Sequence, residues 1–302
     1  ASINIKSKPV KTSYFTGEEL DLSGLEIEAV YSDGSTSVII SDIIVNGFDS
    51  SIVGTQTLTV TYGGCTATFE VEVKNLILTA DEVANFIKSR PYGTYTISVT
   101  GEITSNIICD INAAMYDVSM DNGLSNNLLS ITFDLSETTG LTSISCNTFE
   151  YCWDLVSIVI PDSVTSISQY AFENCSRLTN ITVSENNKNY SSSEDGKILF
   201  NKDKTALIAY LNVTDDVIIP EGVTSIDTYV FKDCSSITIP ASVTSIPFNQ
   251  CDNNLKNVYI SDLAAWCNID FGAKEYHGPI SYDYNLYLNG NLITDLVIPE
   301  GV

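Results

Sequence analysis

The stretch Val164-Thr-Ser-Ile-Ser-Gln-Tyr-Ala-Phe-Glu-Asn-Cys175 decides the fold, because its pattern also occurs 23 residues earlier and returns later in the chain. Self-similarity at about 20 to 50 residues is typical of solenoids, in which each repeat buries its apolar face against its neighbours. The pattern therefore predicts a solenoid over residues 129–302. Its other copies are Leu141-Thr-Ser-Ile144 with Phe149 and Cys152, Val223-Thr-Ser-Ile226 with Phe231 and Cys234, and a weaker Val243-Thr-Ser-Ile246 with Cys251.

Each repeat contains two candidate strands. Ile158-Val-Ile160 is followed by Pro161, which cannot donate to a strand ladder and marks the end of the strand. The Val-Thr-Ser-Ile phrase predicts a second short strand, with Val and Ile pointing inward and Thr and Ser outward. Two segments interrupt the period. Residues 184–216 predict a polar loop and an added hairpin packed on the coil, and residues 263–271 predict a short helical turn.

Cysteines occupy one slot of the repeat. Cys152, Cys175 and Cys234 each follow the repeat's Phe by three residues, so we expect them to stack inside the coil. A buried thiol packs as a small hydrophobic group, which favours free thiols. A bridge between Cys152 and Cys175 also fits the close approach of neighbouring coils. The chain has no Cys-x-x-Cys motif, so no zinc ribbon or redox site is indicated. Cysteines without a repeat slot are Cys65, Cys109, Cys146 and Cys267.

Residues 1–75 predict a β-sandwich. Short β-rich runs are separated by turn signals such as Tyr62-Gly-Gly-Cys65, where glycine supplies the positive φ of a tight hairpin. Leu25, Ile27 and Ala29 alternate with polar residues, so one face is buried. Several short strands at close spacing indicate a sandwich. The expected strands are 3–5, 25–31, 37–40, 57–62 and 67–73.

Residues 76–128 predict an α/β cap for the N-terminal end of the solenoid. Thr79-Ala-Asp-Glu82 is a capping box that begins a helix, and Pro91 ends it. A strand at Tyr95–Val99 follows. Ile107, Ile108, Ile111, Ala114, Met115 and Val118 then recur at helical spacing. An open solenoid end would expose apolar surface, which favours a cap over the alternative of a small independent domain.

Composition limits the partners. The chain has 14 Lys and Arg against 38 Asp and Glu, a formal charge of −24. Nucleic acid and anionic lipid both need a basic surface, so neither is expected as a partner. No stretch reaches the about 18 consecutive apolar residues of a membrane span. No basic and apolar leader begins at Ala1, so the protein is cytosolic or its leader is not part of this chain. We expect a monomer.

Two family resemblances follow from these motifs. The order Tyr14-Phe-Thr-Gly17, Val30-Tyr-Ser-Asp-Gly34 and Gly54-Thr-Gln-Thr-Leu58 resembles a bacterial immunoglobulin-like (Ig-like) domain. The phrases Ile-Pro-Asp/Glu-x-Val-Thr-Ser-Ile and Ala-Phe-x-x-Cys resemble the BspA-like leucine-rich repeats over residues 129–302. The chain ends inside a repeat at Leu296-Val-Ile-Pro-Glu-Gly-Val302. The resemblances imply a mainly β protein in which an Ig-like spacer precedes a capped leucine-rich-repeat solenoid, secreted or on a cell surface.

The sequence offers little for catalysis. His277 is the only histidine, so a two-histidine metal site is excluded and a serine triad would depend on one loop residue. Phosphate-loop and nucleophile-elbow motifs are absent. Acidic residues leave open a pair for glycan hydrolysis or a calcium site at Asn186–Asn189 with Glu194-Asp-Gly196, although the calcium-loop spacing is missing. We expect a solvated loop there, no cofactor, no metal and no enzyme activity.

The resulting hypothesis is a non-enzymatic surface or secreted protein whose repeats bind a protein or glycan of a host or neighbouring cell. The alternative is an ancillary or spacer region of a larger secreted enzyme whose catalytic domain lies outside this chain. Outward residues of a solenoid can vary without disturbing its core, and aromatic residues are enriched where binding energy concentrates. The candidate ligand-binding residues are Trp153, Ser157, Thr165, Thr182, Thr224 and Tyr259.

Overall fold

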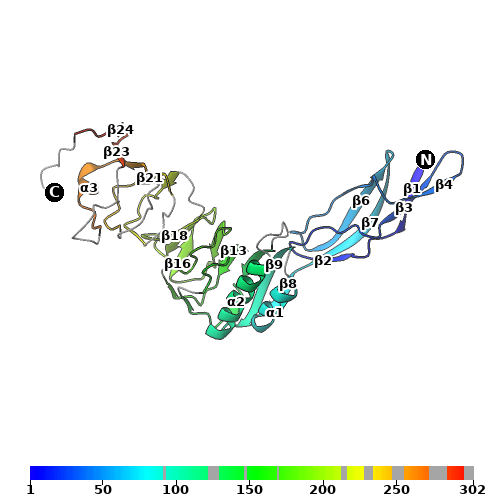
Figure 1. Cartoon of the computed structure of the whole chain (residues 1–302), viewed down its shortest axis with the longest axis horizontal. Coiled ribbons are helices and arrows are strands. Elements are labelled where there is room, and N and C mark those ends of the chain that lie inside the picture. Colours follow the sequence, from blue (N-terminus) through cyan, green and yellow to red (C-terminus); the bar gives the residue numbers. More distant parts are fainter. Residues whose placement is uncertain are drawn as a thin grey trace.

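The chain is elongated and bent, with the N-terminal strands at one end, two helices near the middle and the last strands at the other end (Figure 1). It is mainly β. The computed structural model describes residues 1–90, 93–121, 129–145, 148–168, 170–211, 216–227, 234–246, 255–271 and 284–295. The predictions that concern Phe231, Cys251, His277 and the last repeat at 296–302 lie outside the described residues.

The N-terminal part is an Ig-like sandwich of two sheets, with strand orders β1-β3-β4 and β2-β7-β6-β5. The predicted sandwich is confirmed. The two-residue turn between Tyr62 and Cys65 places Gly63 and Gly64 at positive φ, as its sequence predicts. β2 and β5 are missed by the sequence analysis because three residues are too few to show alternation. The strands are β1 (Ser2–Ser7), β2 (Ser13–Phe15), β3 (Glu26–Val30), β4 (Thr36–Ile39), β5 (Ile44–Asn46), β6 (Gly54–Tyr62) and β7 (Cys65–Lys74).

Two helical crossovers follow the sandwich. β8 (Leu76–Thr79), α1 (Ala80–Ser89), β9 (Gly93–Glu102), α2 (Ser105–Asp121) and β10 (Leu129–Asp134) alternate along the chain. The three strands pair in parallel, and parallel neighbours need a long connection, which each helix supplies. Glu82 accepts hydrogen bonds from the Thr79 amide and hydroxyl at 2.9 and 2.7 Å, so the predicted helix start is confirmed. Buried Ile111 and Met115 confirm the predicted inner face of α2.

A buried carboxylate joins the sandwich to this segment. The Glu18 side chain is 8% exposed and lies 2.9 Å from Lys11 Nζ and 3.4 Å from Arg90 Nη1. It also accepts a hydrogen bond from the Phe15 amide at 2.7 Å. The Thr16 carbonyl accepts a hydrogen bond from the Thr96 amide at 3.2 Å. Thr96 lies on β9, one residue before Ile97, which pairs with Leu76 at the start of β8. Ion pairs and backbone bonds therefore both cross this junction.

The repeats begin as a parallel sheet. β10, β13 (Leu155–Ile160) and β15 (Asn180–Val183) follow β9 in the order β9-β10-β13-β15, and β11 (Thr138–Thr139) pairs with the far end of β9. The Thr-Ser-Ile phrases form the second ladder, in which β12 (Ser143–Ile144) pairs with β14 (Ser166–Ile167) one period later. Phe149 and Phe172 stack with ring centroids 5.7 Å apart. The predicted inward Val and Ile of the phrase are confirmed at Val164 and Ile144.

A second sheet forms the C-terminal part of the repeats, with the order β19-β21-β22-β23-β24. β18 also pairs with β20, within a separate sheet of order β16-β17-β18-β20. The predicted helical turn is confirmed as α3 (Leu263–Cys267), which Asp262 caps by accepting from the Ala265 amide at 2.9 Å. The elements are β16 (Tyr190–Ser192), β17 (Ile198–Asn201), β18 (Ala206–Tyr210), β19 (Asp216–Ile218), β20 (Ser225–Ile226), β21 (Ser236–Ile239), β22 (Asn257–Ile260), β23 (Asn285–Leu288) and β24 (Asn291–Leu292).

The insertion lies between two hydrophobic cores. The predicted hairpin exists as β17 and β18, but it does not pack on the outside of the coil. Leu199 belongs to the core that contains α2 and β13, whereas Ile198 and Phe200 belong to the core of the second sheet. Successive residues of a strand point to opposite faces, so β17 supplies apolar side chains to both cores. The insertion therefore separates the first strand sheet from the second.

Candidate functional site

The outward positions of the first sheet form polar ladders. Thr132 pairs with Thr96 and with Ser157, and Ser157 pairs with Asn180, so these side chains lie side by side across β9, β10, β13 and β15. The Ser157 and Thr182 hydroxyls both donate to Asn180 Oδ1, at 3.2 and 3.0 Å. This surface offers hydroxyl and amide groups but no aromatic ring. Binding by Ser157 and Thr182 stays a prediction.

Thr165 and Thr224 lie elsewhere, each just before the short strand of a Thr-Ser-Ile phrase, β14 and β20, in two different sheets. The Thr165 hydroxyl donates to the Thr142 carbonyl at 3.2 Å, and the Thr224 hydroxyl donates to the Thr205 carbonyl at 3.1 Å. Thr244 repeats the arrangement by donating to the Thr224 carbonyl. Each of these threonines is exposed, yet its hydroxyl is bonded to the backbone of a segment about 20 residues earlier in the chain. These contacts explain why the phrase uses Thr without any ligand.

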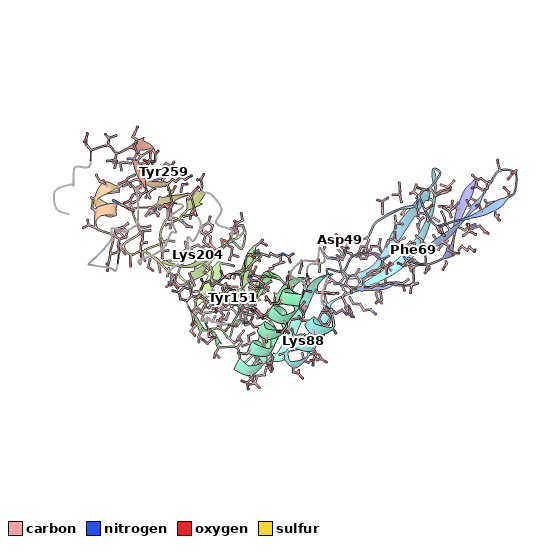
Figure 2. The ribbon with its side chains drawn as sticks, viewed as in Figure 1. Asp49, Phe69, Lys88, Tyr151, Lys204 and Tyr259 are labelled. Atoms are coloured by element: carbon pink, nitrogen blue, oxygen red, sulfur yellow. The ribbon has the colours of Figure 1, made fainter. Side chains whose placement is uncertain are left out.

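Tyr259 lies on the second sheet, beside a second tyrosine that the sequence analysis missed. Thr238, Tyr259 and Tyr287 are in register on β21, β22 and β23, and Ile218 of β19 pairs with Thr238. The two tyrosine rings stack with centroids 4.8 Å apart and planes at 22°. Figure 2 labels Tyr259 in the C-terminal part of the repeats, far from the Ig-like sandwich.

A polar ladder runs beside the two tyrosines. Asp216, Ser236, Asn257 and Asn285 are in register on the same four strands. Asn285 Nδ2 donates to Asn257 Oδ1 at 3.2 Å, and Ser236 donates to Asp216. The ring pair and this ladder together offer an apolar platform with adjacent hydrogen-bonding groups, which is the composition expected of a binding face.

Trp153 lies in the turn before β13, on neither ladder. Its ring centroid is 6.0 Å from that of Tyr116 on α2 and 6.1 Å from that of Tyr151. The six predicted ligand residues therefore occupy five places: Trp153 in the turn, Ser157 and Thr182 on the first sheet, Thr165 before β14, Thr224 before β20, and Tyr259 on the second sheet. One continuous strand face does not contain them, because the inserted hairpin divides the sheets.

The repeat cysteines are packing groups. No disulfide joins any of the six cysteines that the structure describes. Cys152 Sγ donates to Asn112 Oδ1 at 3.1 Å, and Cys175 Sγ donates to the Phe149 carbonyl at 2.8 Å. Burial raises the pKa of Cys175 to about 12 and also raises the pKa of Cys152. Because the thiolate is the nucleophilic form, both sulfurs are held in their unreactive state.

The loop at Asn186–Asn189 serves the fold. Asn187 is fully buried, so the expectation of a wholly solvated loop is wrong at this residue. Its amide donates to the Pro161 and Val164 carbonyls, and its Oδ1 accepts from the Asn189 and Tyr190 amides. Asn187 follows Val164 by one period and continues the coil with hydrogen bonds. Within the described residues, no group of three or more His, Cys, Asp or Glu is arranged to hold a metal ion.

The fold and these surfaces define a mainly β protein in which an Ig-like sandwich precedes repeated strand and turn units. Comparison with protein families names both parts. Residues 7–73 match the bacterial Ig-like domain (group 3), and residues 124–194 and 209–268 match the BspA type leucine rich repeat region in six copies. The chain thus contains a bacterial Ig-like domain at its N-terminus, followed by BspA-type leucine-rich repeats. Of the helices in the described part of the chain, none is long and apolar enough to span a membrane.

Two relatives share part of the chain. Pectate lyase L of Thermoclostridium stercorarium is 40% identical over 107 residues, which are 35% of this chain and 9% of that protein. Exo-beta-1,6-galactobiohydrolase of Bifidobacterium longum is 32% identical over 114 residues, 35% of this chain and 7% of that protein. The chain thus spans less than a tenth of the length of either relative.

Two solved structures of bacterial leucine-rich-repeat proteins resemble this chain at low sequence identity and low TM-score. A leucine-rich repeat protein from Eubacterium ventriosum is 19% identical, with a TM-score of 0.36, over 79% of this chain and 80% of that one. A leucine rich cell surface protein from Faecalibacterium prausnitzii is 18% identical, with a TM-score of 0.32, over 84% and 81%.

Proposed function

We propose that the chain is a non-enzymatic binding region of a secreted or cell-surface protein, in which residues 76–128 cap a leucine-rich-repeat solenoid. The observation that supports this best is the pair of stacked tyrosines, Tyr259 and Tyr287, in register on β22 and β23. Their rings are partly exposed and neither belongs to the buried core. Repeat proteins use such aligned outward positions to vary ligand specificity at little cost to stability.

The ligand class is a protein or a glycan displayed on another cell. Planar aromatic rings provide contact area with few rotatable bonds, and the neighbouring Asn257 and Asn285 amides add directional hydrogen bonds. The chain acts as a monomer in this proposal. The Ig-like sandwich serves as a spacer, to which the Glu18 ion pairs give a defined orientation relative to the repeats.

The test is capture on an array of extracellular-matrix proteins and glycans, with product release from each glycan measured in parallel. The variant Tyr259→Thr/Tyr287→Thr copies Thr238, the residue in register on β21, so the sheet should keep its stability. Tyr31→Thr, on the Ig-like sandwich, is the matched control for loss of an exposed tyrosine. Saturable capture that the double variant loses supports the proposal. If the double variant captures the ligand as well as the wild type does, the Tyr259 and Tyr287 face is not the binding site. Product release from a glycan refutes a non-enzymatic role.

The second candidate is an ancillary region of a larger secreted enzyme that acts on carbohydrate. It is favoured by the two relatives, a pectate lyase and an exo-beta-1,6-galactobiohydrolase, each of which matches 35% of the chain. The gene that encodes this chain distinguishes the candidates. A hydrolase or lyase domain in the same reading frame supports the ancillary role, whereas an anchor or further repeats supports the first proposal.

A further inference from the structure

Three aromatic side chains meet on the helix side of the repeats, away from both strand ladders. We call Tyr116, Tyr151 and Trp153 the aromatic corner. Tyr116 is tilted 37° against Trp153 and Tyr151 is nearly perpendicular to it at 82°. Tyr116 and Tyr151 are each 43% exposed. Tyr151, labelled in Figure 2, lies on the α2 side of the repeats, as its chain of ring contacts to Tyr116 requires.

The repeat itself provides the internal comparison. One period after Tyr151 and Trp153 stand Asn174 and Ser176, and the same slots flank Cys234 with Asp233 and Ser235. The coil therefore needs only a small polar residue at each slot. Packing of the repeat therefore does not require two large rings at these positions, or the third ring that contacts them from α2.

The backbone adds a cost at Tyr151. Its φ is 59°, in the left-handed region, and Asn174 has the same φ of 59°. Asparagine tolerates this conformation, whereas a bulky residue there is strained. Strain of about 1 kcal/mol or more that a neighbouring repeat avoids with Asn is a recognised sign of a functional position.

The chain segment that contains the aromatic corner is acidic in sequence, and Asp154, next to Trp153, pairs with Arg177 at 3.4 Å. Between Arg90 and Arg177 the sequence contains ten Asp or Glu and no Lys, Arg or His. Arg177 is engaged, because its guanidinium donates to the Leu129 carbonyl and the Ser130 hydroxyl, both at 2.6 Å. Within the described residues, cations lie over Tyr14, Phe86 and Phe200, and none lies over the three rings of the corner.

We propose that the aromatic corner is a second binding surface, which takes an arginine or lysine side chain of a protein partner. The negative faces of the rings attract a cation, and the excess of acidic residues in this segment and in the chain as a whole complements a partner's positive charge and speeds encounter. Tryptophan and tyrosine are enriched at binding hot spots, as is arginine. This surface shares no residue with the Tyr259 and Tyr287 face, so either can fail without the other.

The experiment uses the full chain and two peptides at about 0.15 M salt, where long-range attraction is screened. One peptide alternates glycine with arginine, and the other replaces each arginine by citrulline, which keeps the planar shape and loses the charge. The variant Tyr151→Asn/Trp153→Ser copies Asn174 and Ser176 and leaves the net charge unchanged. Tyr31→Asn is the control, since Tyr31 is 42% exposed on the Ig-like sandwich. Affinity is measured by calorimetry and folding by thermal melting.

We expect the arginine peptide to bind at least tenfold more tightly than the citrulline peptide, and the double variant to lose about tenfold in affinity while Tyr31→Asn loses none. Equal binding by wild type and double variant overturns the proposal. So does equal binding of the two peptides. A neutral oligosaccharide that the wild type binds and the double variant does not would make the corner a glycan site instead. If the double variant unfolds at a lower temperature than the wild type, the affinity of the single variant Tyr151→Asn, which relieves the left-handed strain, is compared with that of the wild type instead.

Discussion

Replacement of Asn187 tests whether the inserted loop is held by one buried amide. In Asn187→Ala, the carbonyls of Pro161 and Val164 and the amides of Asn189 and Tyr190 lose partners that lie at 2.8 to 3.1 Å. A typical hydrogen bond contributes about 0.5–1.5 kcal/mol net, and a buried group left unsatisfied costs about 1–3 kcal/mol. Partial access of water to the loop lowers the sum, so we expect a loss of about 3–4 kcal/mol in the free energy of unfolding.

The assay is urea denaturation followed by tryptophan fluorescence. Trp153 and Trp266, the two tryptophans of the chain, both lie in the repeats, so the signal reports on the repeats and not on the Ig-like sandwich. Asn186→Ala is the matched control because Asn186 is exposed, and its change should stay within about 0.5 kcal/mol. If Asn187→Ala loses less than about 1 kcal/mol, water replaces the amide and the reasoning is refuted.

Two further predictions concern the cores. Leu199→Ala removes a fully buried side chain of β17 and should lower the free energy of unfolding by about 2–5 kcal/mol in the same assay. The control Ile218→Ala, at a residue that is 64% exposed, should lower it by less than about 0.5 kcal/mol. Equal losses in the two variants would contradict the placement of β17. Burial raises the pKa of Cys175 from 9.0 to about 12, so its contribution to stability is fully present below pH 9 and lost as pH rises toward 12. Iodoacetamide at pH 8 should modify Cys152 and Cys175 only after unfolding, which peptide mass spectrometry checks; equal rates in native and unfolded protein would contradict their burial.

Much of the candidate site could be found from the repeat, but not its arrangement. Aligning residues by period identifies Tyr151 and Trp153 as aromatic residues in slots that elsewhere hold Asn, Asp or Ser. Tyr116 could not be found in this way, because it comes from α2 and no period relates it to Trp153. Tyr287 was missed for a related reason, since the segment before β23 departs from the repeat pattern and gives no slot in which to expect it.

The sequence by itself determined that the chain is mainly β, which two families its parts belong to, and inward residues of the repeat such as Ile144 and Val164. Those properties depend on local spacing, which a period of 23 residues and strand alternation display directly. Only the tertiary structure decided that β17 lies between two cores, that the strands of the repeats form separate sheets instead of one continuous face, and that Asn187 is buried. The physical reason is that each of these depends on which surfaces meet after the chain has folded. A polar residue in a polar segment looks solvated until backbone groups of the preceding coil are brought within hydrogen-bonding distance.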